Sequence, residues 1–95
     1  MNKNPLVSVI VPIYGVEPYI EKCARSLFEQ SLENMEFIFV NDCTPDKSVE
    51  ILRQVIEDYP RRYLQIQIIE HEETRGLAMA RNSGLLIAKG EYIIH

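Results

Sequence analysis

The sequence predicts an α/β protein with a Rossmann-like, three-layer α/β/α arrangement built on a parallel sheet. Short apolar runs rich in β-branched residues alternate with segments whose apolar residues recur every three to four positions. The resulting order is β-α-β-α-β-α-β, which at this spacing is typical of right-handed crossovers in a parallel sheet. Such crossovers put the first two helices on one face and the third on the other, which predicts the strand order 3-2-1-4.

Four segments are expected to form the strands. Residues 7–13 (VSVIVPI) and 36–40 (EFIFV) are nearly continuous apolar runs, as in strands that are buried on both faces. The third strand is expected at 64–70 (LQIQIIE), and residues 91–95 (EYIIH) begin the fourth.

Two helices are expected before the third strand. Residues 17–30 carry one apolar helical face, which includes Cys23. The second helix is expected to open at Pro45, with Thr44 as its cap, and to end at Pro60.

The third helix is expected from Leu77 to about Lys89, closed by Gly90. One of its faces carries only small residues, namely Ala80, Gly84 and Ala88. Glycine inside a helix costs about 1 kcal/mol relative to alanine, so Gly84 indicates that the helix packs closely on the sheet.

Composition limits the function classes. A chain of 95 residues, 46% of them hydrophobic, suffices for one small domain. A net charge of -4 disfavours a surface for nucleic acid or anionic membrane. The tight basic pair Arg61 and Arg62 is expected in a solvated loop. No stretch approaches the roughly 20 apolar residues of a membrane span, and a cytoplasmic location is expected.

Ligands of open parallel sheets bind beyond the carboxyl ends of the strands, which singles out the loops at 12–18, 41–46 and 71–76. The sequence contains no GxGxxG motif, no GxxxxGK[ST] motif and no GxSxG motif. It also lacks the D-x-D spacing that holds a divalent metal.

The first two loops carry candidate binding residues. Tyr14 offers an aromatic face for stacking a base, and Gly15 lets the backbone approach a ligand. Glu17 stands where a helix begins, a position that suits an acid on dipole grounds alone. The carboxylate of Asp42 could accept a hydrogen bond from a base or sugar, or it could form an Asx turn or cap the second helix.

The third loop is basic as well as acidic. Arg75 and Arg81 lie beside the start of the third helix, where either could bind a diphosphate or pair with a carboxylate. A salt bridge is expected for Arg75, because Glu72 and Glu73 are close to it in the sequence. His71 is expected to be a loop residue.

Three blocks of the chain together resemble family 2 of the glycosyltransferases, inverting enzymes of the GT-A fold that use nucleotide-diphosphate sugars. VSVIVPIYG is similar to the family's V-S-V-I-V-P-x-Y-N, and FIFVNDCTPDKS to its I-x-V-V-D-D-G-S-T-D-x-S. TRGLAMARNSGLLIAKGEYI is similar to N-x-G-x-x-x-A-R-N-x-G-x-x-x-A-x-G-E-Y-I. The blocks occur in order and at the family's spacing through nearly the whole chain.

The resemblance implies roles for particular residues. Those that match the segment lining the nucleotide are Pro12, Ile13, Tyr14 and Glu17. Tyr14 would lie near the base. Asp42 matches the second Asp of the D-D pair, which accepts a hydrogen bond from the uracil imide. Arg81 matches the Arg of the A-R-N block, near the diphosphate. The departures from the family pattern are Gly15 for Asn, Asn41 for Asp, Cys43 for Gly and Thr74 where Asn is common.

In the family, G-E-Y-I is followed by a D-x-D that holds Mn²⁺ or Mg²⁺, and the catalytic base lies further on. This chain stops at His95, before both. The resemblance therefore implies that residues 1–95 are a single truncated GT-A domain, the N-terminal nucleotide-sugar-binding half. It implies no catalytic or metal-binding residue in the fragment, no activity of the fragment alone, and a metal ion in the full-length parent.

The parent is expected to transfer a sugar from a UDP-sugar to a hydroxyl group of a glycan or lipid-linked acceptor, with inversion, in polysaccharide or cell-envelope glycan synthesis. Its association with the cytoplasmic side of a membrane stays open. The alternatives are a non-catalytic α/β interaction module, which in receiver-like form needs acids at the end of the first strand, and a nucleotidyltransferase, which needs a Gly-rich basic loop there. Because one helix cannot cover four strands, self-association through the uncovered face or edge is also expected.

Overall fold

The computed structural model describes residues 5–94, which form a four-stranded parallel sheet in the order β3-β2-β1-β4. The strands are β1 (Val7–Ile13), β2 (Met35–Asn41), β3 (Ile66–Glu70) and β4 (Tyr92–Ile94). The helices are α1 (Glu17–Phe28), α2 (Ser48–Glu57), α3 (Leu77–Ile87) and the short 3-10 helix η1 (Pro60–Gln65). The predicted fold class and strand order are confirmed.

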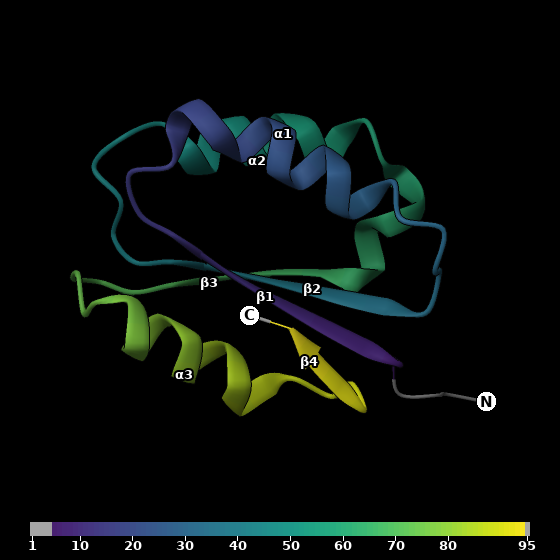
Figure 1. Cartoon of the computed structure of the whole chain (residues 1–95). Coiled ribbons are helices and arrows are strands. Elements are labelled where there is room, and N and C mark those ends of the chain that lie inside the picture. Colours follow the sequence, from purple (N-terminus) through teal and green to yellow (C-terminus); the bar gives the residue numbers. More distant parts are fainter. Residues whose placement is uncertain (1–4, 95) are drawn as a thin grey trace.

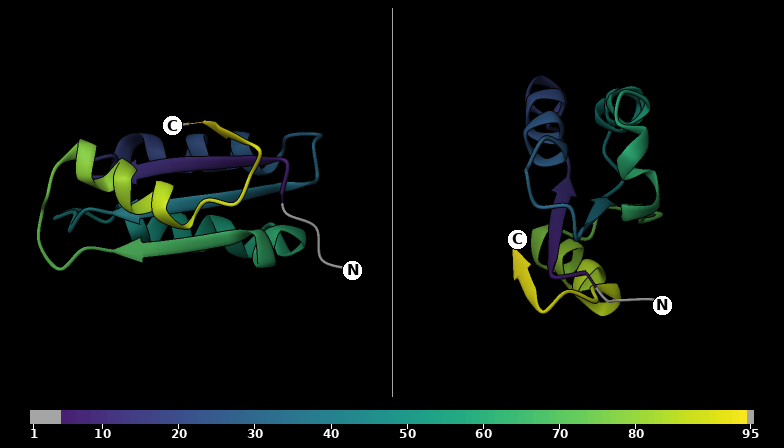
Figure 2. Two further views of the ribbon diagram at one scale, coloured as in Figure 1. Left: turned by 90° about the horizontal axis from the view of Figure 1, so that it is seen from below. Right: turned by 90° about the vertical axis from the view of Figure 1, so that its right-hand side faces the viewer.

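The sheet lies between two helical layers. α1 and α2 cover one face, and α3 covers the other (Figure 1). The view along the sheet shows the same three layers, with β4 at the edge beside β1 (Figure 2). Successive residues of β2 serve both cores, because side chains alternate across a strand. Phe37 and Phe39 pack with α1 and α2, whereas Ile38 and Val40 pack with Ala80 of α3.

The parallel register brings the candidate loops together. Ile13 at the end of β1 pairs with Asn41 at the end of β2, and Asn41 pairs with Glu70 at the end of β3. The residues that follow these three positions therefore emerge at one edge of the sheet. This is the carboxyl edge, where the sequence predicted ligand binding.

Close packing of α3 on the sheet is confirmed. A Cβ added to Gly84 would lie 2.5 Å from Cγ2 of Ile10. Gly90 was expected to close the helix, but α3 already ends at Ile87 and Ala88 has an extended backbone conformation. Gly90 is required for another reason: a Cβ there would lie 2.6 Å from the backbone nitrogen of Ser8.

The starts of α2 and β3 also differ from the prediction. α2 begins at Ser48 instead of Pro45, and Thr44 does not cap it. The carboxylate of Asp46 instead accepts the Ser48 backbone N–H at 3.1 Å. β3 begins at Ile66, because the two preceding residues belong to η1. The last residue predicted for β4, His95, lies outside the described residues.

The expectation of a solvated arginine pair is wrong for Arg62, which is 7% exposed. Its guanidinium donates to one side-chain oxygen, of Gln65, and to the backbone carbonyls of Phe28, Gln30, Leu32 and Glu33. It also lies over the Phe37 ring. Arg62 thereby holds the α1–β2 connection to η1.

The apolar face of α1 is narrower than predicted. Its buried residues are Ile20, Ala24 and Phe28. Cys23, which was expected on this face, is exposed. A cysteine beside a buried alanine in the sequence can therefore still lie outside the packed stripe.

A surface of large exposed apolar side chains lies on α3 and β4. We call it the α3/β4 surface, and it consists of Leu77, Met79, Leu85, Leu86 and Ile93. Tyr92 and Ile94 are also exposed, but they pair with Val7 and Val9 and therefore lie on the other face of the sheet, which α1 and α2 cover. None of the helices between residues 5 and 94 has the length and hydrophobicity needed to cross a bilayer.

Candidate functional site

A pocket of about 450 Å³ lies at the carboxyl edge of the sheet. It is lined by Pro12, Tyr14, Val16, Asp42, Thr74, Gly76, Leu77 and Ala80. These residues come from the end of β1, from the loops after β1, β2 and β3, and from the start of α3. The lining is mainly apolar, and Asp42 is its one acidic member. A ligand with an apolar or aromatic body and a hydrogen-bond donor fits this combination.

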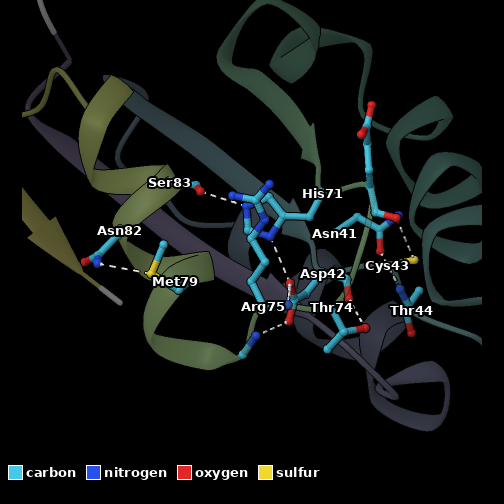
Figure 3. A network of polar contacts seen from close by, with 12 residues as sticks. Asn41, Asp42, Cys43, Thr44, His71, Thr74, Arg75, Met79, Asn82 and Ser83 are labelled. Carbon is cyan, nitrogen blue, oxygen red and sulfur yellow. Dashed lines mark hydrogen bonds and ion pairs between the residues drawn. The ribbon is translucent and has the colours of Figure 1, made fainter.

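The carboxylate of Asp42 is buried and bound by the loop after β3 (Figure 3). Oδ1 accepts hydrogen bonds from Nδ1 of His71 at 2.8 Å and from the backbone N–H of Arg75 at 2.9 Å. Oδ2 accepts the backbone N–H of Gly76 at 2.9 Å. The bond from His71, aided by that from Arg75, lowers the pKa of the Asp42 carboxyl from its ordinary value of 3.8. Asp42 is thus held as a carboxylate.

Asp42 is not the turn or cap residue of its loop. The Asx contact is made by Asn41, whose Oδ1 accepts the Thr44 backbone N–H at 3.0 Å. A carboxylate offers about four acceptor positions, and the bonds within the chain occupy three of them. One position, on Oδ2, has no donor among the described residues, and Asp42 lines the pocket.

Gly76 and Cys43 give the two loops around Asp42 their shape. Gly76 has φ +97, a conformation that favours glycine, and this lets the chain present two successive N–H groups to Asp42 before α3 begins. Cys43 has φ 56 and is the only non-glycine residue in the described range with positive φ. It stands where the family pattern has glycine, so the backbone shape is kept without the usual residue.

His71 is the residue of this site that the sequence analysis missed. Its side chain is 7% exposed, and its ring lies between Asp42 and Ser83 (Figure 3). Nε2 lies 2.7 Å from Oγ of Ser83 in α3. A signal was available, since His71 directly follows β3 as Asp42 directly follows β2, and the two strands are paired.

The predicted site residues separate into two groups. Pro12, Tyr14 and Asp42 line the pocket together. The side chain of Ile13 is fully buried in the core beneath α1 and α2, and only its carbonyl reaches the site, by accepting the Asp42 backbone N–H at 3.0 Å. Glu17 does not line the pocket, and its carboxylate instead accepts the Lys47 backbone N–H at 2.9 Å.

The two arginines of the third loop also differ. Arg81 is half-buried on α3, and its Nε is buried with no hydrogen-bond partner among the described residues. The salt bridge expected for Arg75 is absent, because neither Glu72 nor Glu73 pairs with it in the described chain. The backbone of Arg75 binds Asp42 instead.

The loops after β1 and β2 are joined by polar bonds at the same edge. Asp46 accepts hydrogen bonds from the hydroxyls of Ser48 at 2.6 Å and Thr44 at 2.7 Å. These bonds lower the pKa of Asp46 from 3.8 to about 2. Thr44 Oγ1 in turn accepts the Gly15 backbone N–H at 2.9 Å. The wall of the pocket that carries Tyr14 is therefore fixed to the next loop.

A second hollow, of about 380 Å³, lies at the opposite end of the sheet, where Tyr59, Arg62 and Gln65 contribute to its lining. Its buried charged group, Arg62, already donates hydrogen bonds to backbone carbonyls and to Gln65. The pocket at Asp42 retains a free acceptor and is the better candidate site. Residues 5–94 contain no group of three His, Cys, Asp or Glu side chains that could hold a metal ion.

Comparison with known proteins identifies the family. Residues 8–95 match the family described as Glycosyl transferase family 2. The chain belongs to glycosyltransferase family 2. A Bacillus subtilis protein named "Uncharacterized glycosyltransferase EpsJ" is 52% identical over 89 residues, which are 94% of this chain and 24% of EpsJ. The "Putative teichuronic acid biosynthesis glycosyltransferase TuaG" of the same species is 40% identical over 97% of this chain and 35% of TuaG.

Solved structures of glycosyltransferases share the fold. The mannosyltransferase PcManGT from Pyrobaculum calidifontis, in complex with GDP-Man and Mn²⁺, superposes with a TM-score of 0.85 at 32% identity, over 97% of this chain and 27% of that protein. S. aureus TarS in complex with UDP-GlcNAc superposes with a TM-score of 0.77 at 33% identity, over 93% and 25%. The family 2 chain thus spans about a quarter to a third of the length of these relatives.

Proposed function

We propose that this chain is the nucleotide-binding part of a glycosyltransferase whose donor is a UDP-sugar. The observation that carries the proposal is the pocket at the carboxyl edge, in which a buried carboxylate with one free acceptor position adjoins an apolar lining. Tyr14, 52% exposed at the rim, supplies an aromatic face for a base. Family membership supports this reading, because relatives of the same fold have been solved with nucleotide sugars.

The free position on Asp42 selects among bases by hydrogen-bond chemistry. Uracil carries a ring N–H between two carbonyls, and guanine also carries a ring N–H, so both can donate to a carboxylate. The corresponding ring nitrogen of cytosine or adenine has a lone pair, which the carboxylate repels. The two structures reported above were solved with GDP-Man and UDP-GlcNAc, whose bases are of the donating kind. We propose uracil as the base for this chain.

Arg81 would contribute on the diphosphate side. A buried guanidinium nitrogen without a partner is unfavourable, and an anionic oxygen is the acceptor that suits it best. Arg81 adjoins Ala80, which lines the pocket. Pro12 would border the nucleotide, whereas Ile13 and Glu17 would act by shaping the two loops.

The reaction proposed for the parent protein is inverting transfer to a hydroxyl acceptor. A carboxylate base would take the proton of the hydroxyl group, which then attacks the anomeric carbon in line as the nucleoside diphosphate leaves. We propose that the parent uses Mn²⁺ or Mg²⁺, as the PcManGT structure contains Mn²⁺. The described residues do not fit such an ion, so other residues of the parent would hold it.

The proposed setting is cell-envelope glycan synthesis, because relatives of this chain are named for teichuronic and teichoic acid biosynthesis. A glycan or lipid-linked acceptor, and a parent that works on the cytoplasmic side of a membrane, belong to the same proposal. So does the expectation that residues 1–95 bind nucleotide without turnover of any UDP-sugar.

A nucleotide titration tests the proposal. Binding of UDP, GDP, CDP and ADP to the chain would be followed by ligand-observed NMR and calorimetry. We expect UDP to bind most tightly, and the preference for UDP over CDP to be lost in Asp42→Asn, because an amide cannot reproduce the carboxylate's acceptors. Asp58→Asn, which changes an exposed acid at the end of α2, is the matched control and should bind as wild type does. Equal binding of all four nucleotides would contradict the proposal.

We also propose that the chain self-associates through the α3/β4 surface. Leu86 is 86% exposed and Ile93 40% exposed, and both belong to the exposed apolar side chains of this surface. β4 pairs only with β1, so its outer edge is open within the described chain. A second copy of the chain is the proposed partner, because its β4 edge could pair with this one and its apolar side chains could pack on the same surface.

A further inference from the structure

The ring of His71 is held at both nitrogens. Nδ1 lies 2.8 Å from Oδ1 of Asp42, and Nε2 lies 2.7 Å from Oγ of Ser83. The side chains of His71 and Asp42 are 7% and 4% exposed, so water does not compete strongly for these bonds. The backbone N–H of His71 also donates to the carbonyl of Asn41 at 2.9 Å. The ring of His71 therefore cannot rotate without breaking its bonds to Asp42, which follows β2, and to Ser83 of α3.

The chemistry of Asp42 sets the proton on this ring. A carboxylate only accepts hydrogen bonds, so Nδ1 must carry the hydrogen that points to it. In the neutral ring Nε2 then has a lone pair, which accepts the hydroxyl hydrogen of Ser83. The opposite tautomer would place a lone pair of Nδ1 against Oδ1 of Asp42. One tautomer is thus specified by two partners that are far apart in the sequence.

With the bond from His71, the two carboxylate oxygens of Asp42 accept different numbers of hydrogen bonds. Oδ1 receives two hydrogen bonds, from His71 and Arg75, whereas Oδ2 receives one, from Gly76. Without His71, the carboxylate could turn about its own axis and share the two loop N–H groups differently. His71 thereby fixes which oxygen remains available to a ligand.

An Asp-His-Ser chain of hydrogen bonds also occurs in serine hydrolases, but the position of Ser83 argues against that chemistry. Ser83 lies inside α3 (Leu77–Ile87), where the backbone N–H groups are used by the helix. They are not free to stabilise an oxyanion. The chain of bonds instead runs from α3 toward the pocket, and its last member, Asp42, lines that pocket.

We propose that His71 is a positioning residue for base selection: with Ser83 behind it, it orients Asp42 so that Oδ2 meets the ring N–H of the nucleotide base. This inference rests on the proposed function of the pocket. His71 does not line the pocket, but it would affect which base is preferred. A residue that only stabilised the fold would not have this effect.

Two isosteric substitutions separate the two ends of the ring. In His71→Asn the amide nitrogen takes the place of Nδ1, so the donor to Asp42 is kept and the contact to Ser83 is lost. In His71→Gln the amide nitrogen takes the place of Nε2, so the contact to Ser83 is kept and the donor to Asp42 is lost. The two variants are matched, because both replace the imidazole ring by a polar amide.

Binding of UDP and CDP to these variants is the test. We expect His71→Gln to lower UDP affinity about tenfold and to reduce the preference for UDP over CDP, since one charge-assisted hydrogen bond no longer orients Asp42. His71→Asn should keep the preference within about threefold of wild type, because the donor is retained. Unfolding in urea shows whether each variant is folded under the binding conditions.

Imidazole nitrogen NMR gives a readout that does not need the nucleotide. The chain has two histidines, and His95→Gln leaves only the signal of His71. We expect the Nδ1–H tautomer in wild type and a shift toward Nε2–H in Asp42→Asn. An Nε2–H tautomer in wild type would overturn the inference.

The outcomes separate this inference from the proposed function. A wild type that prefers UDP, together with a folded His71→Gln variant of unchanged preference, would overturn the role of His71 and leave the proposed function standing. A wild type that binds no nucleotide would overturn both.

Discussion

Glu17 and Asp46 bind each other's loops across 29 residues of sequence: Oδ2 of Asp46 accepts the backbone N–H of Glu17 at 3.1 Å, and Oε1 of Glu17 accepts the backbone N–H of Lys47 at 2.9 Å. The start of α1 and the approach to α2 are thereby held together. The carboxylates satisfy N–H groups that the helix starts leave open. The rim of the pocket at Asp42 thus depends on acids that do not line it.

Stability in acid follows from this arrangement. The pKa of Asp46 is about 2 in the folded chain, against 3.8 ordinarily, because the hydroxyls of Ser48 and Thr44 donate to it. The unfolded chain therefore takes up the proton first. The stabilisation is complete above about pH 4 and is lost as the pH falls toward 2. We expect the free energy of unfolding to decline across this window, and to decline less steeply in Asp46→Asn.

Urea unfolding at a series of pH values measures the slope of the free energy of unfolding against pH. Asp42, whose pKa is also lowered, should account for part of the slope that remains in the variant. Glu57→Gln is the control and should keep the wild-type slope, because Glu57 is exposed and forms no ion pair among the described residues. The account of Asp46 is contradicted if Asp46→Asn and wild type lose stability in parallel.

Arg62, which is buried, and Arg61, which is exposed, allow the same substitution to be compared at two neighbouring positions. Arg62 is buried and donates to four carbonyls and to Gln65, a pattern that the single ammonium of lysine cannot reproduce. We expect Arg62→Lys to lower the free energy of unfolding by about 2 to 4 kcal/mol. Arg61→Lys, at an exposed position, should change it by less than about 0.5 kcal/mol. Equal effects in urea unfolding would contradict the role of Arg62.

Arg62 shows what could not be predicted from the sequence. The strands, the helical faces and the strand order follow from apolar periodicity and the handedness of crossovers, which are local and general rules. The four backbone carbonyls that bind Arg62 lie 29 to 34 residues earlier, at the end of α1 and in the α1–β2 connection. An arginine in a polar stretch gives no local sign of such partners.

Only part of the candidate site could be predicted from the sequence. Tyr14 and Asp42 were expected at the carboxyl edge because they directly follow strands, and the structure places both in one pocket. The bonds of Asp42 to Arg75 and Gly76 could not be predicted, because they depend on the positive φ of Gly76 and on the register of β2 with β3. The burial of Ile13 follows from side-chain alternation, which turns it toward the core.

The contact between Gly84 and Ile10 is tested by a double-mutant cycle. Gly84→Ala adds a methyl group 2.5 Å from Cγ2 of Ile10. We expect a net loss of about 1 kcal/mol, since overpacking costs about 1 to 3 kcal/mol and the gain in helix propensity offsets up to about 1. In an Ile10→Ala background the added methyl group has room, and the same change should become neutral or stabilising. An identical effect in both backgrounds would show that the two residues do not interact.

Self-association is tested on the α3/β4 surface. Leu86→Glu places a charge within this apolar surface and should shift the chain toward monomer in light scattering at high protein concentration. Leu64→Glu is the matched control, because Leu64 is 102% exposed but lies on η1. A wild-type chain that remains strictly monomeric at high concentration would contradict the prediction.

The most direct test of the central claim is to map UDP onto the chain by backbone amide chemical shifts. We expect the largest shifts for residues of the pocket at the carboxyl edge, namely Tyr14, Thr74, Gly76 and Ala80. Amides of the second hollow, such as those of Tyr59 and Gln65, should not move. Shifts concentrated at that hollow, or no shifts at saturating UDP, would contradict the placement of the nucleotide at Asp42.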